Sequence, residues 1–143
     1  MATYQKFQDY AEQLNKGVHN WSTHTFKARL LNSAPDPALD AVVADLPAEI
    51  AAGNGYTAGG MGLDTVTLSE SGGTAKVTIA DEVLTASGGS IGPFRYIVFY
   101  NDTPTSPADP LVCYYDYGSR LTLADTETFT IDFDATNGLW TFA

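Results

Sequence analysis

The chain has 143 residues and a mass of 15.3 kDa; 44% of its residues are hydrophobic and 17% are charged. This composition is typical of one folded domain and excludes a largely disordered chain. No apolar run approaches the roughly 20 residues of a membrane helix, so we expect no membrane partner. The net charge of −10 would repel phosphate backbones, so we expect no nucleic acid partner either.

The charge is unevenly placed along the chain. The first 30 residues carry four basic and two acidic side chains, whereas the remaining residues carry three basic and fifteen acidic ones. A solvated acidic surface is the simpler interpretation. The alternative is a mildly basic front end that docks on a partner while the acidic body faces solvent.

The first predicted element is a helix over residues 4–16. Its apolar stripe repeats at intervals of three and four residues and consists of Tyr4, Phe7, Ala11, Leu14 and Val18. Thr3 is suited to the N-cap, and Gly17 to the left-handed position just beyond the C-terminal end. We therefore divide the chain into a helix or arm over 1–18 and a β body over 19–143; the helix would dock either on a partner or on its own β body.

The pattern then changes to the alternation of a strand. One face of this strand is expected to carry His24, Phe26, Ala28 and Leu30. The prolines of 33–40 indicate a loop, because each proline fixes φ and lacks an N–H donor. Residues 41–50 have room for one or two helical turns, and the glycine-rich stretch 53–62 predicts a long turn.

From residue 64 onward the sequence predicts short strands separated by turns. The expected strands are Asp64–Ser69, Ala75–Ala80, Glu82–Thr85, Phe94–Tyr100, Leu111–Tyr117, Leu121–Leu123, Thr128–Phe133 and Leu139–Phe142. Asn137 and Gly138 predict a type I′ hairpin, across which the last two strands should pair. This pattern indicates a mainly β fold, either an antiparallel β-sandwich or a jelly roll, with one short N-terminal helix.

Candidate reactive residues do not form a known pattern, so we expect no enzyme, no cofactor and no metal site. The stretch 132–138 has carboxylates at the first and third positions of a calcium loop, but Asn137 replaces the required glycine and no closing glutamate follows. His19 and His24 are five residues apart without a cysteine partner, so no zinc site follows, and core-edge or solvated histidines are expected. Cys113 lies in an apolar strand, where a free cysteine is usually a small buried side chain.

Cys113 is also the only cysteine, which rules out an intrachain disulfide and is typical of a protein made in a reducing cytoplasm. The first ten residues lack the apolar core of an export signal. We therefore expect synthesis in the cytoplasm.

Aromatic residues are the most informative side chains for contacts. Tyr114, Tyr115 and Tyr117 lie on one predicted strand, whose alternation sends Tyr115 and Tyr117 to one face and Tyr114 to the other. Some of them therefore belong to the core. The exposed ones, together with Trp140, would either stack on sugar rings or anchor a protein interface, where tyrosine and tryptophan are enriched.

Several sequence blocks resemble a family of small structural proteins of tailed bacteriophages. The blocks are KGVHN at Lys16–Asn20, the T-x-K-x-x-L-x-N strand at Thr25–Asn32, EIAAGNGYTAGG at 49–60, ASGGSIGPFRYIVFYND at 86–102 and YYDYGSRLTLADTETFTIDFDATNG at 114–138. They are spread along nearly the whole chain, from Lys16 to Gly138. They are structural blocks and carry no signature of an activity.

The resemblance implies a virion structural protein, with capsid decoration or cement proteins as the nearest functional analogy. Such a protein would bind the major capsid protein on the outer surface of the capsid and associate with itself as a dimer or trimer. A neck, tail or fibre-associated protein is the alternative, and a carbohydrate-binding β-sandwich that aids host attachment is a second one. The residues expected at an interface are Tyr4, Phe7, Lys16, Lys27, Arg29, Tyr56, Tyr114, Tyr115 and Tyr117.

Overall fold

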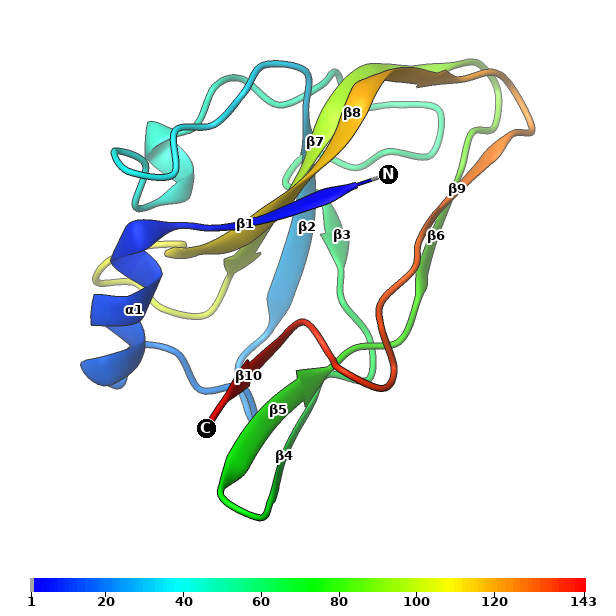
Figure 1. Ribbon diagram of the computed structural model, residues 1–143. Helices are drawn as coiled ribbons and strands as arrows, with labels where there is room; N and C mark the ends of the chain where they lie inside the picture. Colours follow the sequence, from blue (N-terminus) through cyan, green and yellow to red (C-terminus); the bar gives the residue numbers. More distant parts are fainter. Residues whose placement is uncertain (1) are drawn as a thin grey trace.

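The computed structural model describes residues 2–143, which form ten strands, one α-helix and one 3-10 turn (Figure 1). The strands are β1 (Thr3–Lys6), β2 (Phe26–Leu31), β3 (Met61–Gly62), β4 (Thr67–Ser71), β5 (Thr74–Thr78), β6 (Glu82–Thr85), β7 (Ile91–Asn101), β8 (Leu111–Leu123), β9 (Thr128–Ile131) and β10 (Trp140–Phe142). The helix α1 spans Gln8–Asn15, and a single 3-10 turn, η1, spans Val43–Asp45.

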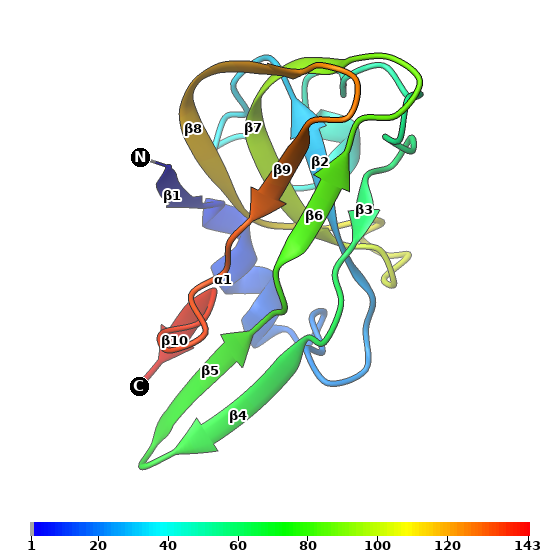
Figure 2. The same ribbon diagram turned by 90° about the vertical axis from the view of Figure 1, so that its right-hand side faces the viewer.

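The strands form two layers of antiparallel sheet, which confirms the predicted mainly β fold with one short helix near the N-terminus. The first layer is a five-stranded sheet with the order β1-β8-β7-β2-β3. The second layer consists of the sheets β6-β9 and β10-β5-β4. Figure 2 shows β6 and β9 in front of β7, β8 and β2, with β4 and β5 below them. No helix within residues 2–143 is long and apolar enough to cross a membrane.

The main core lies between the two layers, and a smaller core lies on the other face of the five-stranded sheet. Strand β7 serves both, because Ile97 and Phe99 point into the main core and Val98 and Tyr100 into the smaller one. The residues that cover the smaller core are Phe7, Val43 and Leu46. Burial on both faces explains why the sequence of β7 is apolar without alternation.

The N-terminal residues form a strand before they form a helix, which corrects the helix predicted over 4–16. Strand β1 pairs with β8, and Tyr4 lies opposite Tyr115. The helix begins only at Gln8, so Thr3 is a strand residue and not the N-cap. An isolated helix of this length is marginal in water, so the pairing with β8 decides the conformation of the preceding residues.

The end of α1 agrees with the prediction. Gly17 has a φ of 78°. Its amide donates to the Leu14 carbonyl at 3.1 Å, and the amide of Val18 donates to the Gln13 carbonyl at 3.0 Å. These two hydrogen bonds form a Schellman motif, which satisfies carbonyl groups that the helix itself leaves free.

The N-terminal segment is part of the folded body and not a separate arm. The side chain of Phe7 is fully buried in the smaller core. Tyr10 is buried in the main core, where its hydroxyl accepts a 2.8 Å hydrogen bond from Nε1 of Trp21. The boundary predicted at residue 18 therefore does not separate two independently packed units.

Most of the predicted strands occur within a few residues of their expected bounds. Strand β6 spans Glu82–Thr85, as predicted. The two strands predicted over Leu111–Tyr117 and Leu121–Leu123 form one continuous strand, β8. The intervening residues stay in the sheet because β7 and β8 shift register there.

The hairpin predicted at Asn137 and Gly138 is wrong. Strand β9 pairs with β6, and β10 pairs with β5. The cause is Asp134, whose carboxylate accepts hydrogen bonds from the amides of Thr136 and Asn137, both at 2.8 Å. Asn137 lacks the positive φ that a type I′ turn requires, so the chain turns away from β9 and leads to the edge of β5.

The glycine-rich loop at 49–60 packs closely against β2. A Cβ atom on Gly60 would lie 2.0 Å from the carbonyl oxygen of Ala28. Tyr56 is buried, and its hydroxyl bonds both to the β2 backbone and to the carboxylate of Glu49. The glycine and the tyrosine of this block therefore serve close packing.

Candidate binding groove

An open groove lies between the inner face of β8 and the edge of β9. Its volume of about 580 Å³ is within the range of small-ligand sites. It forms because the second layer ends at β9, whereas the first layer continues through β8 to β1. In Figure 2, β9 lies in front of the five-stranded sheet, and β8 and β1 extend beyond it. The side chains that shape the groove are Ile97, Tyr115, Tyr117, Phe129, Asp132 and Asp134.

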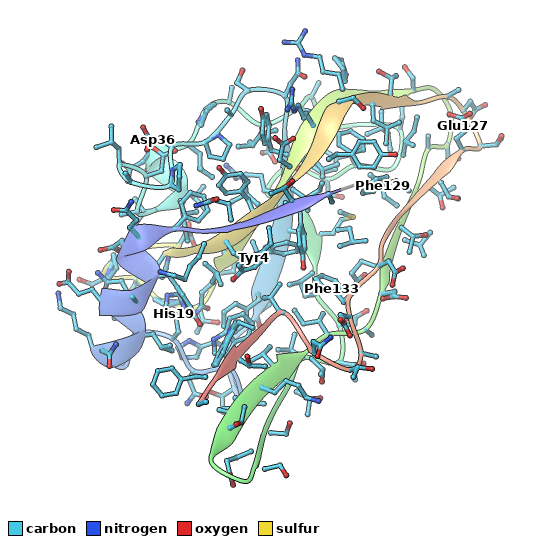
Figure 3. All side chains as sticks on the ribbon, viewed as in Figure 1. Tyr4, His19, Asp36, Glu127, Phe129 and Phe133 are labelled. Carbon is cyan, nitrogen blue, oxygen red and sulfur yellow. The ribbon has the colours of Figure 1, made fainter. Side chains whose placement is uncertain are left out.

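Aromatic side chains form the wall and the floor of this groove. Tyr115 packs edge-on against Tyr4 and Phe99, with ring centroids 5.8 and 5.6 Å apart. Tyr117 packs edge-on against Phe129 at 5.8 Å, and Figure 3 shows Phe129 projecting from β9 toward β1 and β8. Edge-to-face contacts of this kind restrict the orientation of the rings. The groove is therefore preorganised.

A bulge in β8 positions Tyr117 at the groove. Residues 117–120 of β8 lie opposite a single residue of β7, Arg95. The guanidinium of Arg95 donates two hydrogen bonds, of 2.7 and 3.0 Å, to the Asp116 carboxylate and thereby lowers the pKa of that carboxyl. This ion pair anchors the start of the bulge, and bulges commonly redirect a side chain. Tyr117 remains 38% exposed.

The polar end of the groove is acidic. Hydrogen bonds from the backbone and the side chain of Asn137 lower the pKa of Asp134. Burial, with smaller effects from Cys113 and Asp134, raises the pKa of Tyr115 to about 12. The carboxylate of Asp132 has neither a hydrogen bond nor an ion pair within residues 2–143, and no basic side chain of this part of the chain lines the groove.

Three of the nine residues predicted at an interface meet at this groove. Tyr115 and Tyr117 line it, and Tyr4 supports Tyr115 from β1. Tyr114 points to the opposite face of the sheet, as the strand alternation predicts, and packs against Phe7 with ring centroids 5.3 Å apart. The groove thus gathers residues from two strands that are far apart in the sequence.

Phe7 and Tyr56 were also assigned to an interface, and their burial corrects that assignment. Phe7 is 0% exposed and Tyr56 is 2% exposed. Both side chains pack inside the protein, where the burial of their large apolar rings stabilises the core. Neither reaches a surface that a partner would touch.

The basic residues predicted at an interface take part in ion pairs. Lys16 pairs with an acid of its own helix. Lys27 pairs with Asp102 at 3.0 Å, and Arg29 lies 3.6 Å from Glu49. The last two pairs join the basic front end to acidic residues of the body. The predicted basic docking patch is therefore largely neutralised within the fold.

A second, more open groove of about 480 Å³ lies between the end of α1 and β10. Phe142 and Leu68, which are 66% and 41% exposed, form part of its rim. Trp21 stacks on Phe26 at 3.7 Å and belongs to the core, whereas Trp140 packs edge-on against Trp21 at 6.0 Å. The indole N–H of Trp140 is buried without a hydrogen-bond partner within residues 2–143.

The two histidines share one hydrogen-bonding partner. Nδ2 of Asn101 lies 3.2 Å from Nδ1 of His19 and 2.9 Å from Nδ1 of His24. The Asn101 oxygen accepts a hydrogen bond from the Thr103 amide, so the NH₂ group faces both rings and each Nδ1 acts as an acceptor. Burial, with a smaller effect from His24, lowers the pKa of His19 to about 4.

The remaining candidates for chemistry are dispersed or buried. Within residues 2–143, no three His, Cys, Asp or Glu side chains gather closely enough to hold a metal ion. Cys113 is fully buried in the main core, and burial raises the pKa of its thiol. A thiol in this environment is a poor nucleophile.

Sequence patterns did not single out Ile97, Phe129 or Asp132 as groove residues. These residues lie in or directly after strands with ordinary alternation. Alternation indicates on which face of a strand a side chain lies, but it does not indicate which residues lie opposite that face.

Comparison with known proteins finds no matching family model, no matching curated protein and no matching solved structure.

Proposed function

We propose that the protein is a structural component of a bacteriophage virion, specifically a capsid decoration protein that binds the outer shell and stabilises contacts between capsomers. The observation that carries this proposal is the resemblance of five sequence blocks, spread over nearly the whole chain, to small structural proteins of tailed phages. Its partners would be the major capsid protein and further copies of itself, in a dimer or trimer.

Two features of the fold support a role in adhesion. The groove beside β9 is preorganised by edge-to-face aromatic contacts, so little conformational entropy is lost when a partner binds. The loop at 49–60 is tied to β2 by close backbone contact and by hydrogen bonds. On a capsid lattice, repeated binding of an oligomer makes weak individual contacts sufficient.

Location and copy number in the virion test this proposal. Quantitative gel densitometry of purified virions should give a copy number comparable with that of the major capsid protein. A cryo-EM reconstruction should then show the protein on the outer surface of the shell. A copy number far below that of the capsid protein, with density at the neck or tail, would favour the alternative role. Absence from the particle would reject both.

A further inference from the structure

The edge of β9 that faces the groove has free backbone groups. The amide of Ala86 donates to the carbonyl of Glu127 at 2.9 Å, in register with the β6-β9 ladder. Since bonded and non-bonded pairs alternate in an antiparallel ladder, the N–H and C=O groups of Thr128 and Thr130 point away from β6. Within residues 2–143 these N–H and C=O groups have no hydrogen-bond partner.

The groove provides room for another strand at this edge. A strand added at the usual spacing of about 4.8 Å would lie over the inner face of β8, at the usual layer distance of about 10 Å. Every second side chain of that strand would point toward the floor of the groove, which Ile97 and Tyr115 make apolar and aromatic. With the added strand, the second layer would also cover the inner face of β8, which β9 leaves open.

The charges of the groove specify one further property of the occupant. Asp132 follows β9 directly, and its carboxylate has no partner within residues 2–143. Lys76 reaches the neighbouring turn, but its ammonium group donates to the carbonyl of Thr136. A lysine or arginine on the added strand would therefore find an unpaired carboxylate, with the ring of Tyr117 nearby for a cation–π contact.

We infer that the groove accepts an extended segment of a partner protein, which adds as a strand to the free edge of β9. Apolar side chains of the segment lie over Tyr115, and a basic side chain lies beside Asp132. Main-chain hydrogen bonds supply affinity in this mode of recognition, and alternate side chains supply specificity. That the partner is a virion protein rests on the proposed function, whereas the strand addition itself does not.

Hydrogen exchange on the isolated protein tests this inference. The probes are acetylated seven-residue peptides in which valine alternates with threonine and one end carries a lysine, together with the same peptides carrying glutamate instead. The lysine peptides should slow exchange of the Thr128 and Thr130 amides by about tenfold or more at saturation. The glutamate peptides should bind more weakly, because their charge is repelled by Asp132.

Substitutions at the two edges of the β6-β9 sheet provide matched controls. Thr130→Pro removes an outward N–H, which edge strands tolerate, and should weaken binding of the lysine peptide at least about tenfold. Val83→Pro makes the same change on the opposite edge and should leave binding unchanged. Asp132→Asn should weaken the lysine peptide by about threefold and abolish its advantage over the glutamate peptide.

Several results would overturn this inference. One is no slowing of exchange at Thr128 and Thr130 with any peptide, and another is equal binding by the Thr130→Pro and Val83→Pro proteins. Protection of these amides on raising the protein concentration alone would identify a second copy as the occupant. Binding of uncharged oligosaccharides at Tyr117, with no peptide binding, would identify a glycan site instead. None of these results bears on where the protein lies in the virion.

Discussion

Single residues are constrained most strongly where two backbones approach each other. Gly60 lies against β2, and a Cβ there would meet the Ala28 carbonyl oxygen at 2.0 Å. Gly72, in the turn between β4 and β5, has no heavy atom within 4 Å of the corresponding position. Both glycines have a positive φ, so the local conformation alone does not distinguish them. The difference lies in the tertiary contact.

Gly60→Ala should therefore lower the free energy of unfolding by about 4 kcal/mol, because a backbone clash adds to the cost of a positive φ. Gly72→Ala should lower it by only about 1 kcal/mol, which is the conformational cost by itself. Urea denaturation of both variants measures the two values. Equal losses would contradict the close contact between the 49–60 loop and β2.

The burial of His19 makes stability depend on pH. The pKa of His19 falls from its usual 6.5 to about 4 in the folded protein, so the unfolded chain binds more protons between these values. The contribution of neutral His19 to stability is therefore fully present above pH 6.5 and is lost as the pH falls toward 4. The full shift corresponds to about 3 kcal/mol, which solvent beside the ring reduces to about 2 kcal/mol.

His19→Gln should remove this part of the pH dependence, because the glutamine oxygen still accepts a hydrogen bond from Asn101 but does not titrate. Unfolding free energies of both proteins, measured by urea denaturation between pH 6.5 and pH 4, give the comparison. Parallel curves for the two proteins would show that His19 does not titrate differently in the folded and unfolded states.

At the scale of elements, the pairing of strands depends on contacts that the local turn sequence does not contain. Asn137 and Gly138 favour a two-residue hairpin, yet the Asp134 carboxylate accepts hydrogen bonds from the amides of Thr136 and Asn137. The Leu139 amide then donates to the carbonyl of Val77 at 2.7 Å, which starts the pairing of β10 with β5. Local turn preference is thus outweighed by a side-chain capped turn and a long-range strand pair.

Paired cysteines distinguish the two arrangements. Val83 lies opposite Thr130 in a non-hydrogen-bonded pair of β6-β9, where Cα atoms are about 4.5 Å apart, within disulfide range. The double variant Val83→Cys/Thr130→Cys should therefore form a disulfide on mild oxidation, detected by mass spectrometry. Asp132→Cys/Ala143→Cys, which a hairpin at Asn137 and Gly138 would bring together, should remain reduced. The reverse outcome would restore the hairpin.

For the molecule as a whole, the N-terminal segment and the β body share their cores. Phe7 contributes to the smaller core and Tyr10 to the main one, and β1 forms the edge of the five-stranded sheet. Ion pairs of Lys27 and Arg29 with acids of the body also cross this boundary. The protein is therefore expected to unfold as one cooperative unit.

Calorimetry should accordingly give a single transition with equal calorimetric and van't Hoff enthalpies.

Removal of residues 1–18 should abolish this transition and cause aggregation, since both cores would open. Phe7→Ala should cost about 4 kcal/mol, whereas Phe142→Ala, at a side chain that is 66% exposed, should cost less than about 1 kcal/mol. A truncated protein that melts cooperatively would show that the segment is a dispensable arm.

The sequence by itself determined the class of fold, the strand β6, the buried face of β2 and the glycine-terminated end of α1. These features depend on neighbours within a few residues: alternation along a strand, a glycine beyond a helix, and proline or glycine in a turn. The division of Tyr114 and Tyr115 between two faces followed for the same reason. Each of them is a local property of the chain.

Only the tertiary structure decided which strands pair, which charges neutralise each other and where a groove opens. Strand β1 forms because β8 lies beside it. Lys27 and Arg29 form ion pairs because β2 lies next to Asp102 and Glu49, which are far away in the sequence. The groove exists because β9 ends the second layer before it covers Tyr115. Contacts between residues far apart in the chain leave little trace in the local pattern, since the energy of each strand is set by what lies across from it.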